Sequence, residues 1–223
     1  MPIHDDLINE ISGVIGNLPS NLSSGELNNV YEVYIFTLIL KAAQNEGGSI
    51  RILDQNNNTP TILHFRSGPG YITSNRRDYS FAEILFNNKP PLEVHVSIRI
   101  SGHSHVLHEG DVCVLYQSEA NLCRRSSDRV APRSSKVILN IEAKYYTTPL
   151  ALGLGRGFLG LITDFSSKDL FFVTNTTSSS VESLLAHKRK DRGVNIIPGN
   201  TYPVNNLIVD FQKVFTNFKA KIL

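Results

Sequence analysis

Two short apolar runs, each with a charged residue at one edge, constrain the fold of this chain more than any other feature. Residues 112–116 and 137–141 are rich in β-branched and aliphatic side chains, and polar segments bound both. A strand that is apolar on both sides needs a cover on both faces, as do the central strands of layered α/β proteins. The two runs therefore predict the middle of a β-sheet with a helical layer on each side.

Segments with helical periodicity surround these strands. From Glu26 to Gln44 the apolar residues recur at the spacing of a helix, Ser24 is placed to cap it, and the pair Gly47-Gly48 ends the pattern. Helices that bracket a mixed sheet make an α/β fold. Further helices are predicted at residues 7–14, 81–86, 150–162, 181–189 and 207–218, and further strands at residues 49–53, 61–65, 94–100, 170–174 and 194–197.

The size and composition of the chain favour one core. With 223 residues and 41% apolar side chains, we predict a single domain spanning residues 1–223. The longest apolar run, from Val33 to Leu40, is far shorter than the roughly 20 residues that cross a bilayer, so no membrane span is expected. The amino-terminal residues lack the pattern of a secretory signal, and Cys113 and Cys123 are then expected to be reduced thiols in a cytoplasm.

Three charged residues stand at the edges of the two central strands. Asp111 begins the first, and Glu142 and Lys144 end the second. Side chains two residues apart on a strand share a face, so Glu142 and Lys144 point together, and antiparallel pairing would place Asp111 beside them. Converging carboxylates repel each other unless a cation lies between them, and Mg²⁺, or Mn²⁺ in its place, suits such oxygen ligands. A lysine there can orient or deprotonate a water, or neutralise charge on a phosphate, which predicts phosphodiester hydrolysis.

The stretch His108-Glu109-Gly110-Asp111-Val112, followed by Ile141-Glu142-Ala143-Lys144, resembles the PD-(D/E)xK nuclease superfamily over roughly residues 24–175. The resemblance implies a restriction-endonuclease-like fold, in which helices flank a central mixed β-sheet, and a Mg²⁺-dependent endonuclease with DNA as its substrate. It also implies a homodimer and a role in restriction or anti-phage defence, with room for a regulatory partner protein or signal. No proline precedes Asp111 and no glutamine closely follows Lys144, which leaves the branch of the superfamily open.

The same resemblance implies an extra acid from a helix that precedes the sheet. Glu32 stands in an otherwise apolar helical segment, where a lone carboxylate is costly to bury without a partner or a cation. We therefore expect Glu32, ahead of Glu26, as a third metal ligand beside Asp111 and Glu142. An ion pair between Glu32 and a nearby lysine or arginine is the alternative.

The formal charge is only +2, so attraction to nucleic acid has to come from local basic clusters. One cluster, with Arg124 and Arg125, lies between the two central strands, and a second contains Lys188 and Arg189. Both are expected to be solvated loops that contact backbone phosphates if DNA binds. Arg156 lies among the glycines at positions 153, 157 and 160, whose small size allows the close approach of a sheet, a helix or a DNA backbone.

Two other interpretations remain open. The chain could be a non-catalytic nucleic-acid-binding or assembly module with a nuclease-like fold, although the intact Asp111, Glu142 and Lys144 argue against this. It could also be a cupin-like metal protein, because His103 and His105 are spaced to share one face of a strand and bind Zn²⁺ or Fe. A cupin requires an all-β barrel, which the helical segments oppose.

Overall fold

A seven-stranded mixed sheet forms the centre of the protein. The computed structural model describes residues 2–16, 22, 26–73, 78–167, 169–188 and 190–221. The strands lie in the order in which they occur in the sequence, and neighbours are antiparallel from β1 to β5, whereas β5, β6 and β7 are parallel. They are β1 (Ser49–Asp54), β2 (Ser80–Leu85), β3 (Leu92–Ser101), β4 (Leu107–Tyr116), β5 (Val137–Lys144), β6 (Leu170–Thr174) and β7 (Asp191–Gly193).

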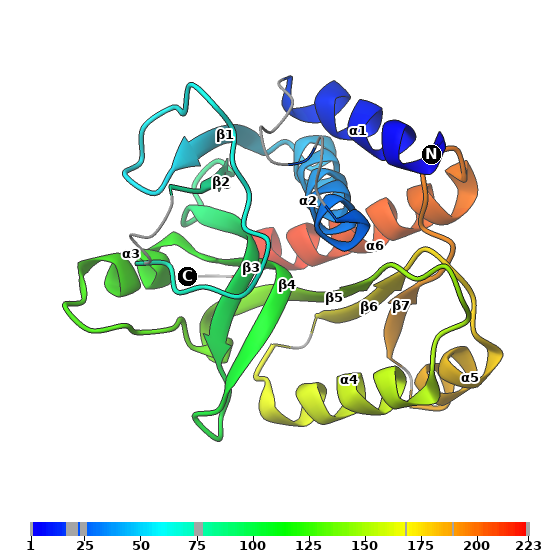
Figure 1. Ribbon diagram of the computed structural model, residues 1–223. Coiled ribbons are helices and arrows are strands. Elements are labelled where there is room, and N and C mark those ends of the chain that lie inside the picture. The colour runs from blue at the N-terminus through cyan, green and yellow to red at the C-terminus, as the bar shows by residue number, and fades with distance from the viewer. Residues whose placement is uncertain are drawn as a thin grey trace.

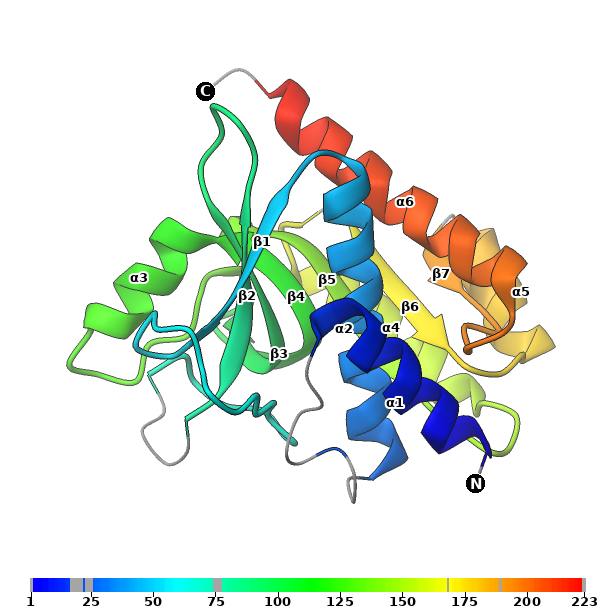
Figure 2. The same ribbon diagram turned by 90° about the horizontal axis from the view of Figure 1, so that it is seen from above.

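Helices cover both faces of this sheet (Figure 1). On one face lie α1 (Pro2–Ile15), α2 (Leu27–Asn45) and α6 (Thr201–Ala220), which are seen from above in Figure 2. On the other face lie α4 (Leu152–Asp164) and α5 (Ser179–His187), while α3 (Gln117–Arg125) stands at the side near β3. A short 3₁₀ turn, η1 (Ser134–Lys136), leads into β5. The predicted α/β class, with helices flanking a mixed sheet, is confirmed.

The two helical layers enclose two apolar cores that share the sheet. Alternate residues of the central strands enter different cores: Ile141 and Ala143 of β5 pack with α2 and α6, whereas Cys113 and Leu115 of β4 pack with α4 and α5. This alternation follows from the two-residue period of a strand. Both predicted central strands are buried on both faces, as their composition indicates.

The long helix α2 follows the predicted pattern closely. Its apolar residues are buried in the first core, and the helix ends where Gly47 adopts a φ of +83°, a conformation that suits glycine. The Gly48 N–H then donates to the Ala43 carbonyl at 2.8 Å, which satisfies one of the free carbonyls of the last turn. Ser24, the expected cap, lies outside the described residues.

Several local predictions were wrong. Residues 81–86 were expected to be helical, but most of this apolar run forms β2 between β1 and β3, because a short buried run fits either structure. Residues 61–65 form no strand, although Leu63 and Phe65 are buried. Helix α3 was not predicted, since only Glu119, Ala120 and Cys123 of this polar segment are buried. A strand was expected at residues 194–197, but the last strand described, β7, ends just before them at Gly193.

The described helices were also compared with the requirements of a membrane span. None of them is both long enough and apolar enough to cross a bilayer.

The central position of β5 gives a stability prediction. Leu139 is fully buried in the first core, so Leu139→Ala should lower the free energy of unfolding by about 3 kcal/mol, through lost burial and the cavity left behind. Leu122 on α3 is 60% exposed, and Leu122→Ala should change the free energy of unfolding by no more than ~0.5 kcal/mol. Urea denaturation measures both values. Equal losses in the two variants would contradict this placement of β5.

Candidate functional site

The structure brings Asp111, Glu142 and Lys144 together at one place on the sheet. Strands β4 and β5 pair antiparallel with Val112 opposite Ile141, so Asp111 lies beside Glu142 as expected. The Lys144 ammonium lies 3.0 Å from the Asp111 Oδ2 and 2.8 Å from the Glu142 Oε1. One cation therefore already links the two carboxylates.

Asp111 is held from two sides. Its Oδ2 accepts hydrogen bonds from the Lys144 ammonium and, at 2.8 Å, from the backbone N–H of Ala143. The Asp111 side chain is only 5% exposed, whereas Glu142 and Lys144 are each 23% exposed. Asp111 is thus fixed at the bottom of the site, and the other two side chains reach solvent.

A pocket of about 290 Å³ opens over this triad. Its wall on the sheet side is formed by His108, Glu109 and the three charged side chains, and α4 contributes the rest. The helical part of the lining is Gly157, Phe158 and Leu161. Phe158 also packs against Phe172 of β6, which anchors α4 below the sheet. The charged groups therefore face a small open space that a substrate group can enter.

An interruption of the sheet lies next to Asp111. The pairing of β3 with β4 joins Val96 to Val112 and Ile98 to Gly110, but it leaves out the pair between them, Ser97 and Asp111. Ser97 has a φ of +49°, which is costly for a residue with a side chain. Across this point β3 changes sides, since Val96 packs in the first core and Ile98 in the second.

This interruption brings in Glu32 from α2. The Ser97 hydroxyl donates to the Glu32 Oε2 at 2.6 Å, so the helix carboxylate is fastened to the strand beside Asp111. Glu32 is also close enough to Asp111 and Lys144 for their charges to affect its pKa. The alternative of a salt bridge to lysine or arginine is not seen among the described residues, where Ser97 is its hydrogen-bond partner.

Asp111, Glu32 and Glu109 all have raised pKa values. Burial, and then the charge of Glu142, raise the pKa of Asp111 to about 7, against the effect of Lys144. Burial, and then the charge of Asp111, raise the pKa of Glu32 to about 8, and burial also raises the pKa of Glu109. Burial lowers the pKa of Lys144, but Asp111 and Glu142 outweigh it and the pKa rises, which keeps the ammonium charged. A further cation at this site would favour the ionised form of these carboxyl groups.

The residues fit a hard divalent cation in part. Within the described ranges, no group of three or more His, Cys, Asp or Glu side chains has the arrangement of a metal cage. Mg²⁺ nevertheless often binds through one or two carboxylates, with waters or substrate oxygens completing its shell. Asp111 and Glu142 converge on a single ammonium and supply such a pair.

The arginines and lysines expected to contact nucleic acid have different surroundings. Arg125, Arg156 and Lys188 are exposed, and Arg156 lies on α4 next to Gly157 of the pocket. Arg124 instead donates to both carboxylate oxygens of the fully buried Glu93, so its charge is already compensated. Arg189 lies outside the described residues.

The histidines do not form a metal centre in the described structure. His108 contacts the Asp164 carboxylate at 2.7 Å, and His103 contacts the Ser166 hydroxyl at 2.8 Å. Hydrogen bonds from Ser104 and His108 lower the pKa of Asp164 to about 2. These contacts tie the turn between β3 and β4 to the end of α4. The all-β barrel that a cupin needs is also absent from the described α/β fold.

Sequence reasoning missed three contributors to this region. Ser97 carried no signal except its polarity within an apolar strand, and Glu109 stood next to the motif without a role. Among the glycines of α4, a Cβ at Gly155 would lie 3.2 Å from Val181 of α5, whereas Gly153, Gly157 and Gly160 have open space. Gly155, which the sequence analysis did not single out, is thus the residue that lets α4 and α5 approach each other.

The chain was compared with protein-family models, with curated proteins and with solved structures, and none of these comparisons found a match.

The raised pKa values predict a pH dependence of stability in EDTA. A carboxyl with a pKa near 4 when unfolded and about 7 when folded keeps its proton longer in the folded state, so stability falls as pH rises between these values. Asp111→Asn removes this titration, and its free energy of unfolding should fall less from about pH 5 to pH 8, by on the order of 2 kcal/mol.

Urea denaturation across this pH range measures the two slopes. Leu139→Ala serves as the control, because it destabilises the fold without removing a charge and should keep the slope of the parent protein. A slope in Asp111→Asn that matches the parent would show that Asp111 is already ionised at low pH.

Proposed function

We propose that this protein is a metal-dependent endonuclease of the PD-(D/E)xK type that hydrolyses DNA phosphodiester bonds. The observation that carries the proposal is the meeting of Asp111, Glu142 and Lys144 on two adjacent strands, at the base of a pocket. Two acids that can hold a cation, with an amine beside them at one solvent-accessible point, suit metal-assisted phosphodiester hydrolysis. DNA as the substrate and restriction or anti-phage defence as the role rest on the superfamily resemblance.

The order of the elements around the site supports this assignment. Helix α2 supplies Glu32, the antiparallel strands β3 and β4 lead to Asp111, and β5 carries Glu142 and Lys144. Helix α4 then crosses below the sheet to β6, which is parallel to β5. This succession is the one that the resemblance to a restriction-endonuclease-like fold implies.

Asp111 and Glu142 would hold the cation, with Glu32 beside them. A bound Mg²⁺ would polarise the phosphate and lower the pKa of a coordinated water. Asp111 and Glu142 raise the pKa of Lys144 in the metal-free protein, and a charged ammonium there would neutralise negative charge that develops on the phosphate. The buried hydrogen bond from Ala143 holds Asp111 in a fixed position for this.

The exposed face of α4 is the best-placed surface for the DNA backbone. Gly157 lines the pocket, and a side chain there would meet open space, so a sugar-phosphate chain can approach closely. Arg156, next to it, and the exposed Lys188 and Arg125 can contact phosphates on either side of the scissile bond. A homodimer would supply one site for each strand.

Plasmid cleavage tests the catalytic assignment. Supercoiled DNA should be cut with Mg²⁺ and not with EDTA, and Lys144→Ala should lower the rate by at least ~10²-fold, because the transition state loses its compensating charge. Lys213→Ala, on the opposite face in α6, serves as the control and should cut at the parent rate. A matched RNA substrate distinguishes the two nucleic acids.

Circular dichroism of each variant shows whether the fold persists. Full cleavage by a folded Lys144→Ala protein would remove this mechanism. Binding of DNA without cleavage by the parent protein would favour the non-catalytic module.

The open space at Gly157 gives a second prediction. Gly157→Leu should leave stability equal or raise it by up to ~1 kcal/mol, since glycine is a poor helix former and no neighbour is hit. The same change should lower plasmid cleavage by about tenfold or more, because the side chain blocks the backbone approach. Gly153→Leu on the same helix, outside the pocket lining, is the matched control. Equal cleavage by both variants would contradict the proposed path.

A further inference from the structure

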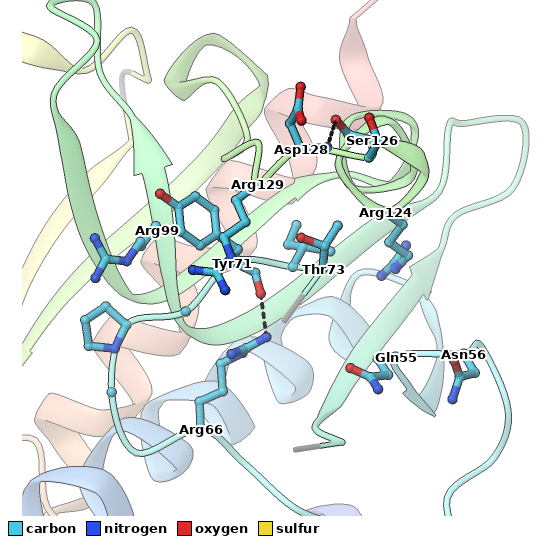
Figure 3. A pocket seen from close by; sticks show the side chains of 15 residues that line it. Gln55, Asn56, Arg66, Tyr71, Thr73, Arg99, Arg124, Ser126, Asp128 and Arg129 are labelled. Carbon is cyan, nitrogen blue, oxygen red and sulfur yellow. Dashed lines mark hydrogen bonds between the residues drawn. The ribbon is translucent and has the colours of Figure 1, made fainter. Parts of the chain in front are cut away.

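A second and larger cavity lies beside β3, apart from the residues that the proposed reaction uses. Its volume is about 740 Å³, and it shares no lining residue with the Asp111 pocket. Three parts of the chain form it: the connection from β1 to β2, Arg99 of β3, and the segment from the end of α3 (Figure 3). The lining residues are Gln55, Asn56, Arg66, Gly68, Pro69, Gly70, Tyr71, Ile72, Thr73, Arg99, Arg124, Ser126, Ser127, Asp128 and Arg129.

The cavity carries a strong positive charge. Four arginines and a single carboxylate, Asp128, line it. Arg124 is compensated by Glu93, but Arg66, Arg99 and Arg129 have no ion-pair partner among the described residues. Guanidinium groups that face one cavity and outnumber its carboxylates repel each other, and an anion in the cavity would relieve this repulsion.

Two of the arginines are held in place before any ligand arrives. The Arg66 guanidinium lies 3.8 Å from the centroid of the Tyr79 ring and donates to the Tyr71 carbonyl at 2.7 Å, a bond drawn in Figure 3. A Cβ at position 70 would lie 2.0 Å from the Arg66 Nη1, so this arrangement needs Gly70. The Arg66 Nε is buried and has no hydrogen-bond partner among the described residues.

Arg124 is fixed by a different network. Glu93 accepts from both of its terminal nitrogens, and the guanidinium also lies 4.7 Å from the centroid of the Phe81 ring. His95, fully buried, contacts the same Glu93 carboxylate at 2.8 Å and stacks on Phe81. A cation fixed in this way loses little conformational entropy when it binds a ligand.

The lining indicates the chemistry of the ligand. Guanidinium groups match phosphate oxygens with paired hydrogen bonds, and the volume lies in the range of small-molecule sites. Tyr71 offers a ring for stacking, and Gln55, Asn56 and Thr73 offer amide and hydroxyl groups. We propose that this cavity binds the phosphates and base of a nucleotide, supplied either as a free nucleotide or by a nucleic-acid strand. The proposal does not rest on the nuclease assignment.

Strand β3 connects this cavity to the Asp111 pocket. The Gly70 N–H donates to the Ser97 carbonyl at 3.1 Å, and the Ser97 hydroxyl is the group that holds Glu32. Arg99 lies directly opposite Glu109, which lines the Asp111 pocket. A ligand on Arg99 and Gly70 would therefore contact one residue that is paired with Glu109 and one that is hydrogen-bonded to Ser97.

Isothermal titration calorimetry in EDTA, without any catalysis, tests the proposal with inorganic pyrophosphate as the first probe. Arg99→Gln and Arg129→Gln should each weaken pyrophosphate binding by about tenfold, the effect of losing one charged hydrogen bond. Neither Arg99 nor Arg129 forms a salt bridge with another described residue, so folding should persist. Arg192→Gln, an exposed arginine on β7, is the matched control and should keep the parent affinity.

Competition then identifies the source of the ligand. Displacement of pyrophosphate by adenosine 5′-diphosphate supports a free nucleotide, and displacement by an oligodeoxynucleotide without terminal phosphates supports a strand. If neither of the two competitors displaces pyrophosphate, the nucleotide assignment is overturned. The proposal also fails if pyrophosphate shows no saturable binding, if both arginine variants bind as the parent does, or if Lys144→Ala is the variant that loses binding.

Discussion

The ion pairs between one ammonium and two carboxylates organise the candidate site of this protein. Lys144 reaches Asp111 and Glu142 at once, because β4 and β5 are antiparallel neighbours with Val112 opposite Ile141. A shift of one residue would turn Glu142 and Lys144 into the first apolar core and bring Ile141 and Ala143 to the pocket. The apolar alternation of β5 therefore fixes the chemistry as well as the packing.

The interruption at Ser97 adds a second constraint. An uninterrupted β3 would pair Ser97 with Asp111 and leave no reason for the left-handed backbone conformation at Ser97. As it stands, the serine hydroxyl fastens Glu32, and its carbonyl receives the Gly70 loop. One residue in a conformation that costs ~1–3 kcal/mol thus joins a helix, a strand and a loop around the triad. A strained conformation of this kind persists only where several surrounding contacts hold the residue in place.

The sequence was informative where a single periodicity decided the structure. The long helix α2, the strand β6 and the position of Asp111 beside Glu142 could be predicted because their patterns admit one arrangement each. Residues 81–86 could not, since a short run buried on both faces has no period that separates a strand from a helix. The pairing of Arg124 with Glu93 could not be predicted from the sequence either, because the two residues are 31 positions apart and their contact depends on the tertiary fold.

The two faces of the sheet differ in what they carry. The face under α1, α2 and α6 is a continuous apolar core, whereas the face over α4 combines a second apolar core with the charged pocket. Glu32 of α2 is linked to the strand beside this pocket through Ser97. Residues that maintain the fold and residues suited to chemistry are therefore largely separate populations. A lineage of such chains can change the α4 surface, and with it the bound partner, while the thicker apolar layer keeps the molecule folded.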